Sequence, residues 1–231
     1  MSVNRIIMAA ASVTADDYLS HSLKSGQVSC LLLGEDDPLP SSFTDTTSKT
    51  TLNTYGNVTT SATKYKTGSR SLSFPGGNAW LSSQTASSFT FPGDFSILFW
   101  IYPTTLSGIL MDFRKKGTEY SNNITLFRSS GYVTLYIDHG YRIGSISPVP
   151  VNEWTHVALI RNSGVITMYI NGVSQGTYAM TAYLAPADST RPLIGGNGFY
   201  TTYFGDSFTG YLDEFVVLPF TALDLTPLTL I

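Results

Sequence analysis

The sequence has few charges, a single cysteine, no run of Lys or Arg and no long apolar stretch. Charged residues make up only 13% of the chain, and the formal net charge is −3. Nucleic-acid binding needs clustered cations that neutralise phosphates, so we do not expect DNA or RNA as a partner. Cys30 stands alone, which excludes an internal disulfide and favours a small buried side chain. No stretch approaches the roughly 20 apolar residues that a membrane span needs.

Aromatic, hydroxyl-bearing and glycine residues are plentiful instead. Aromatic residues make up 13% of the 231 residues, and 20 residues are glycine. This mixture is typical of many short strands with a polar face, joined by tight turns. The length suits one all-β domain, which commonly has about 200–250 residues. No linker or shift in composition follows residue 27, so residues 28–231 are predicted to form a single domain.

Residues 1–27 differ from the rest of the chain. The first thirteen residues are expected to form an extended arm that contains Ile6, Ile7 and Met8. Thr14 is a suitable N-cap for a short helix, which Gly26 can end. We interpret residues 1–27 as a docking segment, because apolar side chains in an arm become ordered when a partner covers them.

From residue 28 onward, apolar residues recur at every second position, which predicts β-strands. Phe95–Tyr102 is apolar on both faces and is expected to be a central, covered strand. Asp36–Tyr55 is rich in Pro, Ser, Thr and Asp and is expected to be a loop with little regular structure. About a dozen strands in all predict two packed antiparallel sheets. The other predicted strands are Val28–Leu33, Asn57–Ala62, Ser71–Phe74, one starting at Trp80, Ile109–Phe113, Ile124–Phe127, Tyr132–Ile137, Thr155–Arg161, Val165–Ile170, Val173–Tyr178, Leu193–Ile194 and Gly210–Leu218.

Four segments, in this order, resemble the laminin-G-like branch of the concanavalin A-like lectin/glucanase superfamily. They are Gly68–Phe74, Asp94–Pro103, Trp154–Gly172 (through Met168-Tyr169-Ile170-Asn171-Gly172) and Phe208–Phe215. Their order and spacing match the family across about residues 28–220. The resemblance implies an all-β jelly-roll sandwich of two antiparallel sheets, preceded here by the arm and short helix.

A second resemblance concerns residues 1–11, which look like the starts of phage virion proteins that carry such sandwiches. It implies a structural protein of the particle, in a capsid-decoration, fibre or tail position, that is made in the host cytoplasm. Its partners would be virion proteins and copies of itself. The alternative function is a carbohydrate-binding adhesin that recognises host-surface glycans, with an extracellular location as the alternative to the virion.

Catalysis is not expected. The hydrolases of the superfamily use a Glu-x-Asp-x-x-Glu strand, which places carboxylates on one sheet face, and no such strand occurs in this sequence. Asp213 and Glu214 are adjacent, so they are predicted to point to opposite faces. The three histidines, His21, His139 and His156, lack the partners of a nucleophilic triad or a zinc site. A glycoside hydrolase therefore ranks third among the functions.

Asp213 is the one metal candidate. Members of the superfamily often hold a structural calcium ion, and Asp213 matches the aspartate of the last family segment. The alternative is a buried carboxylate that accepts hydrogen bonds from backbone N–H groups. No other cofactor is expected.

Aromatic residues near loops are the candidates for ligand binding, since exposed rings suit sugar recognition. The same rings could instead pack as core or meet a neighbouring subunit. The candidates are Tyr120, Tyr141, Phe199, Tyr200, Tyr203 and Phe204.

Overall fold

The computed structural model describes residues 29–32, 34, 38–114, 123–137, 140–186, 191–197 and 207–219. The predicted arm with Ile6, Ile7 and Met8, and the short helix after it, lie outside these residues. Within the described ranges the chain forms two sheets, and the only helical element is a short 3-10 turn, η2 (Ala86–Phe89).

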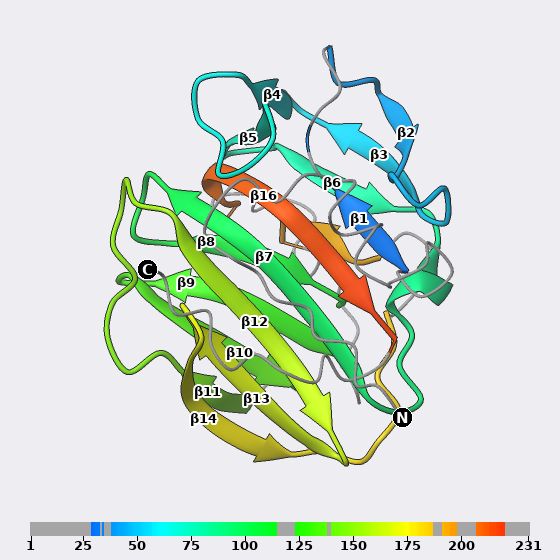
Figure 1. Cartoon of the computed structure of the whole chain (residues 1–231), viewed down its shortest axis with the longest axis vertical. Coiled ribbons are helices and arrows are strands. Elements are labelled where there is room, and N and C mark those ends of the chain that lie inside the picture. Colours follow the sequence, from blue (N-terminus) through cyan, green and yellow to red (C-terminus); the bar gives the residue numbers. More distant parts are fainter. Residues whose placement is uncertain are drawn as a thin grey trace.

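Sheet A has eight strands, in the order β14-β13-β12-β7-β16-β5-β4, and β1 also pairs with β16. β16 therefore has β7 along one side, and β5 and β1 along the other (Figure 1). The strands of sheet A are β1 (Cys30–Leu32), β4 (Thr59–Ser61), β5 (Ser71–Pro75), β7 (Phe95–Pro103), β12 (Thr155–Asn162), β13 (Val165–Ile170), β14 (Val173–Ala179) and β16 (Thr209–Leu218).

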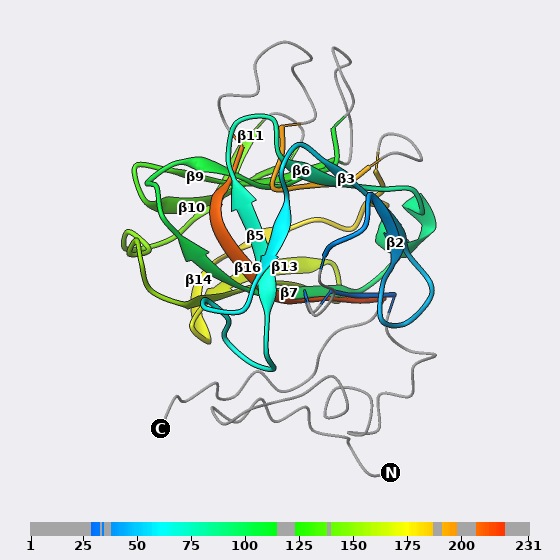
Figure 2. The same ribbon diagram turned by 90° about the horizontal axis from the view of Figure 1, so that it is seen from above.

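Sheet B also has eight strands, in the order β11-β10-β9-β8-β15-β6-β3-β2. Figure 2 shows the two sheets edge-on as two layers, with the core between them. The strands of sheet B are β2 (Ser42–Thr44), β3 (Thr51–Tyr55), β6 (Trp80–Ser83), β8 (Gly108–Asp112), β9 (Ile124–Ser129), β10 (Tyr132–Ile137), β11 (Gly140–Gly144) and β15 (Leu193–Ile194). The predicted two-sheet antiparallel sandwich is confirmed, since the named strands of both sheets pair antiparallel.

β7 lies near the middle of sheet A, and this covered position explains why its sequence is apolar on both faces. Phe95, Ile97, Phe99 and Ile101 belong to the core between the sheets. Leu98 and Trp100 point to the opposite face and are also buried. A strand covered on both faces was the prediction for Phe95–Tyr102, and it is confirmed.

Three hairpins turn at a residue pair that ends in glycine. Ser130-Gly131, Ser163-Gly164 and Asn171-Gly172 each place two consecutive residues at positive φ. Two positive φ values are the mark of the type I′ turn, whose twist matches that of the strands it joins. These turns fix the register of β9 with β10, of β12 with β13, and of β13 with β14.

The prediction that Asp36–Tyr55 is a loop is wrong in part, because β2 and β3 lie within it. Leu52 is the one fully buried residue of β3, and β2 has none, so neither strand carries an alternating apolar signal. β11 was also missed for this reason, since only Ile143 of its five residues is buried. Strands at or near a sheet edge bury little and tolerate polar residues, which hides them in the sequence.

Candidate functional site

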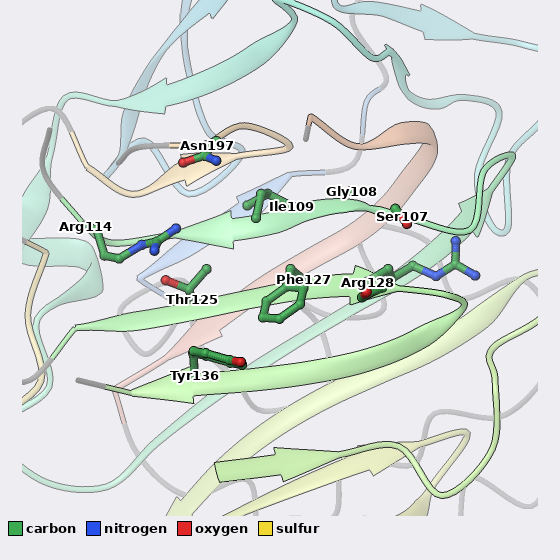
Figure 3. Close-up of a pocket in the computed structure, with 10 residues that line it drawn as sticks. Ser107, Gly108, Ile109, Arg114, Thr125, Phe127, Arg128, Tyr136 and Asn197 are labelled. Atoms are coloured by element: carbon green, nitrogen blue, oxygen red, sulfur yellow. The ribbon is translucent and has the colours of Figure 1, made fainter. Parts of the chain in front are cut away.

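A pocket of about 340 Å³ opens on the outer face of sheet B, the face turned away from the core (Figure 3). Its volume lies within the range of about 300–1,000 Å³ that is common for small-molecule sites. Strands β8, β9 and β10 supply most of its walls. The lining residues are Ser107, Gly108, Ile109, Arg114, Thr125, Phe127, Arg128, Ser129, Tyr136 and Asn197.

Strand alternation turns the key side chains outward. In β9, Ile124 and Leu126 enter the core, so Thr125 and Phe127 between and after them face the pocket. In β10, Leu135 and Ile137 enter the core, and Tyr136 between them faces the pocket. This alternation is visible in the sequence and could have identified Phe127 and Tyr136 as outward-facing aromatic residues.

Three aromatic rings follow one another across this face and form what we call the aromatic ladder: Phe127, Tyr136 and Tyr141. The ring centres of Phe127 and Tyr136 are 5.0 Å apart. Those of Tyr136 and Tyr141 are 6.4 Å apart, with the rings at 87° to each other. Tyr141 is 60% exposed, so the ladder runs from the pocket out to solvent.

Polar groups gather at the opposite side of the pocket. The guanidinium group of Arg114 donates two hydrogen bonds to the fully buried carboxylate of Asp112, at 2.9 and 2.8 Å. The hydroxyl group of Thr125 donates to the same carboxylate at 3.2 Å. The amide side chain of Asn197 lines the pocket nearby. Asp112 therefore orients two of the lining residues from beneath the surface.

Arg128 occupies the rim and has a structural role. Its guanidinium group donates hydrogen bonds to the carbonyl oxygens of Thr105 and of Val149, the latter at 2.7 Å. Burial lowers the pKa of this side chain to about 10, which leaves it charged at neutral pH. Figure 3 shows the guanidinium group pointing away from Phe127 and Tyr136.

Of the six aromatic residues predicted as ligand-binding, the described part of the chain contains only Tyr141. It lies beside the pocket, in contact with Tyr136. Tyr120 falls in residues 115–122, outside the described residues, as do Phe199, Tyr200, Tyr203 and Phe204 in residues 198–206. Both of these segments begin directly after a pocket-lining residue, Arg114 in one case and Asn197 in the other.

The prediction that Asp213 and Glu214 point apart is wrong. β16 has a bulge between Asp213 and Val216, and Glu214 adopts a positive φ of 49°. The backbone N–H of Thr67 donates to the carboxylate of Asp213, and the Thr67 hydroxyl donates to that of Glu214. Both acids are buried, so they stabilise the segment before β5 and do not form an open catalytic pair.

The carboxylate of Asp213 accepts hydrogen bonds from backbone N–H groups, which was the predicted alternative to a calcium site. Its Oδ2 accepts hydrogen bonds from the backbone N–H groups of Lys66 at 2.7 Å and Thr67 at 3.2 Å, and its Oδ1 accepts from that of Glu214. In the ranges that the structure describes, no three His, Cys, Asp or Glu side chains gather as metal ligands. A structural calcium ion with backbone ligands stays a prediction.

The histidines give no catalytic arrangement in the described ranges. His156 lies on the outer face of sheet A and is buried against Trp100, with the ring centres 5.0 Å apart. His21 and His139 lie outside the described residues. Cys30 is buried in the core, as predicted. Within the described residues, no helix has the length and the apolar character of a membrane span.

Comparison with known proteins agrees with this fold. Residues 75–223 match the family described as the concanavalin A-like lectin/glucanases superfamily, a laminin-G type. The match covers more than half of the chain, and the chain belongs to this superfamily. No match was found among curated proteins.

Solved structures with the same fold include two toxins and one sugar-binding domain. The binding domain of Paraclostridial Mosquitocidal Protein 1 has a TM-score of 0.64 at 16% identity, over 88% of this chain and 51% of that one. A structure of botulinum neurotoxin type C, whose cell entry is described as dependent on two ganglioside molecules, has a TM-score of 0.62 at 15% identity, over 87% and 49%. The chain thus spans about half the length of these toxin domains.

The third is domain 4 of AbnA, an extracellular arabinanase from Geobacillus stearothermophilus, in complex with arabinotriose. It has a TM-score of 0.59 at 16% identity, over 88% of this chain and 97% of that one. At these identities the likeness establishes the fold alone. None of the three is a phage protein, so they give no support to the predicted virion role.

Proposed function

We propose that this chain is a non-catalytic carbohydrate-binding domain whose ligand site is the pocket and aromatic ladder of sheet B. The observation that carries the proposal is the ladder itself, which places Phe127 and Tyr136 in the pocket and Tyr141 beside it. A sugar ring has a C–H face that packs on an aromatic ring. Its hydroxyl groups need a few fixed polar partners, which Thr125, Arg114 and Asn197 can supply.

The described lining of the pocket argues against hydrolysis. Glycoside hydrolysis commonly needs two carboxyl groups about 5–9.5 Å apart, on either side of the scissile bond. No Asp or Glu occurs among the lining residues that the structure describes. The carboxylate beneath the pocket, that of Asp112, is fully buried and engaged by Arg114. Binding without catalysis is therefore the function that this face supports best.

The similar structures support the same class of function. A ganglioside is named with botulinum neurotoxin type C, and arabinotriose is bound to domain 4 of AbnA. The adhesin function predicted as the alternative thus has more support than the virion function predicted first. Docking through residues 1–27 stays a prediction, because those residues lie outside the described ranges.

A glycan array tests the proposal. The full chain should bind at least one class of glycan, and Phe127→Ala should weaken that binding by about tenfold or more, since it removes a ring of the ladder that lines the pocket. Tyr65→Ala is the matched control, because Tyr65 is 43% exposed and lies in the β4–β5 loop of sheet A. Circular dichroism verifies that each variant is folded. Absence of binding across the array, or equal loss in both variants, would contradict the proposal.

A further inference from the structure

A second aromatic pair lies on the same outer face of sheet B, on the far side of the pocket. The rings of Tyr55 in β3 and Trp80 in β6 stack with their centres 5.3 Å apart and 16° between the ring planes. The sequence neighbours of Trp80, Ala79 and Leu81, belong to the core, so Trp80 points outward. The register pairs Trp80 with Tyr55. Tyr55 is 42% exposed, which makes this pair an accessible platform.

The platform is level with Phe127, the first ring of the ladder, across the strands. The N–H of Gly195, which follows β15, donates to the carbonyl of Leu110 in β8. Next to Leu110 in β8, Ile109 pairs with Phe127 of β9. Beyond β15, the pairing of Ile194 with Leu81 of β6 places the following residue, Gly195, next to Trp80. Phe127 and the platform therefore lie in one row across the sheet, and Tyr136 and Tyr141 lie in the next row, two residues along the strands.

The two features also share a wall. Asn197 lines the pocket, and the residue before it, Gly196, approaches Trp80 so closely that an added Cβ atom would lie 2.6 Å from the Trp80 Cβ. Gly196 is thus suited to a close approach of backbone to ring, and any larger residue would displace the platform. The half-buried Asn53, on the outward side of β3, adds an amide group near Tyr55.

The extent of these rings across the strands decides what kind of ligand the face fits. Neighbouring strands are about 4.8 Å apart, so the six steps from β11 with Tyr141 to β3 with Tyr55 span about 29 Å. This span is several times the length of one sugar ring. A single terminal sugar would contact the pocket and leave the platform unused.

We propose that the site is extended and binds a linear glycan of several sugar units laid across the strands of sheet B. One part of the chain stacks on Phe127, Tyr136 and Tyr141, and another stacks on the Tyr55–Trp80 platform. This inference rests on the proposed function, and it adds the size of the ligand and a second contact region that the pocket does not include.

The test uses the full chain and a chain-length series. The probes are linear arabino-, xylo-, manno- and gluco-oligosaccharides from disaccharide to hexasaccharide, measured by titration calorimetry. For the class that binds, the affinity should rise with length by about tenfold or more, because more rings are stacked. Tyr55→Ala should remove most of that gain while leaving the affinity for the disaccharide within about twofold of wild type.

Two further variants separate ring stacking from folding. Tyr55→Phe keeps the ring and should bind the hexasaccharide as wild type does, and Tyr65→Ala should be unchanged. Equal affinity for short and long chains, together with an unaffected Tyr55→Ala variant, would overturn the extended site and leave the pocket as the binding site. No binding by any oligosaccharide of the four series, together with no binding on the broad glycan array, would overturn the proposed function as well.

Discussion

His156 and Asp213 flank Trp100 in one row across the outer face of sheet A. The register pairs Trp100 of β7 with His156 of β12 on one side and with Asp213 of β16 on the other. Both flanking residues are only 1% exposed. Burial opposes the charged form of each group, so the pKa of the carboxyl group rises and that of the imidazole falls. The two groups should therefore give opposite pH dependences of stability.

We predict that Asp213 favours folding at acid pH. Burial raises its pKa from 3.8 to about 7, although the N–H groups of Lys66 and Thr67 lower it in part. The folded state then holds a proton that the unfolded state has released. The stability contributed by this proton is complete below pH 3.8 and is lost as the pH rises to about 7, by up to about 1.4 kcal/mol per pH unit.

Asp213→Asn tests this prediction, because the amide keeps the shape and does not titrate. Urea unfolding of both proteins should be measured at steps from about pH 4 to 8. The free energy of unfolding of wild type, minus that of the variant, should decrease as the pH rises and level off above about pH 7. A difference that stays constant with pH would show that the pKa of Asp213 is not raised.

His156 should show the opposite slope. Burial, with a smaller effect of the Lys66 charge, lowers its pKa from 6.5 to about 3. Between these values the unfolded state takes up a proton that the folded state refuses, so stability is lost as the pH falls below 6.5. In His156→Phe, a ring still packs against Trp100 and nothing titrates. Wild type should lose stability relative to this variant by up to about 1.4 kcal/mol per pH unit on acidification in the same unfolding series.

The fold was largely predictable, and the site was predictable only in part. Strands such as β7 bury apolar residues on one or both faces, and the resulting pattern of apolar residues makes these strands recognisable in the sequence. β2, β3 and β11 bury one residue or none, so only pairing with their neighbours defines them. The contact of Tyr141 with Tyr136 depends on the register of β11, which no local pattern encodes. The bulge that redirects Glu214 is equally a product of pairing between β16 and β7.

Two glycines test how closely the backbones of β16 and β7 approach each other in sheet A. Gly210 has a φ of +144°, and an added Cβ atom would lie 2.3 Å from the carbonyl oxygen of Tyr102. Gly77 has a φ of +61° with no atom within 4 Å of the added Cβ. Gly77→Ala should therefore cost about 1–2 kcal/mol from the left-handed backbone alone. Gly210→Ala should cost at least about 3 kcal/mol, because β16 and β7 must also separate. Thermal unfolding of the two variants provides the comparison, and equal losses would contradict the role of close approach.

Asp112 should act on ligand binding through the residues that it holds. Its carboxylate accepts two hydrogen bonds from the Arg114 guanidinium group, one from the Arg114 backbone N–H and one from Thr125, and it has no exposed surface of its own. Asp112→Asn keeps the size but removes the charge that fixes the Arg114 guanidinium group. We expect glycan affinity to fall by about tenfold, with a loss of about 1–3 kcal/mol in the free energy of unfolding. Arg114→Lys is the matched variant, because a lysine cannot reproduce the two-pronged contact and should weaken binding similarly. If Asp112→Asn bound the same glycan as tightly as wild type, the role of Asp112 would be limited to stabilising the fold. Asp112 would then not be needed to position Thr125 and Arg114 for the ligand.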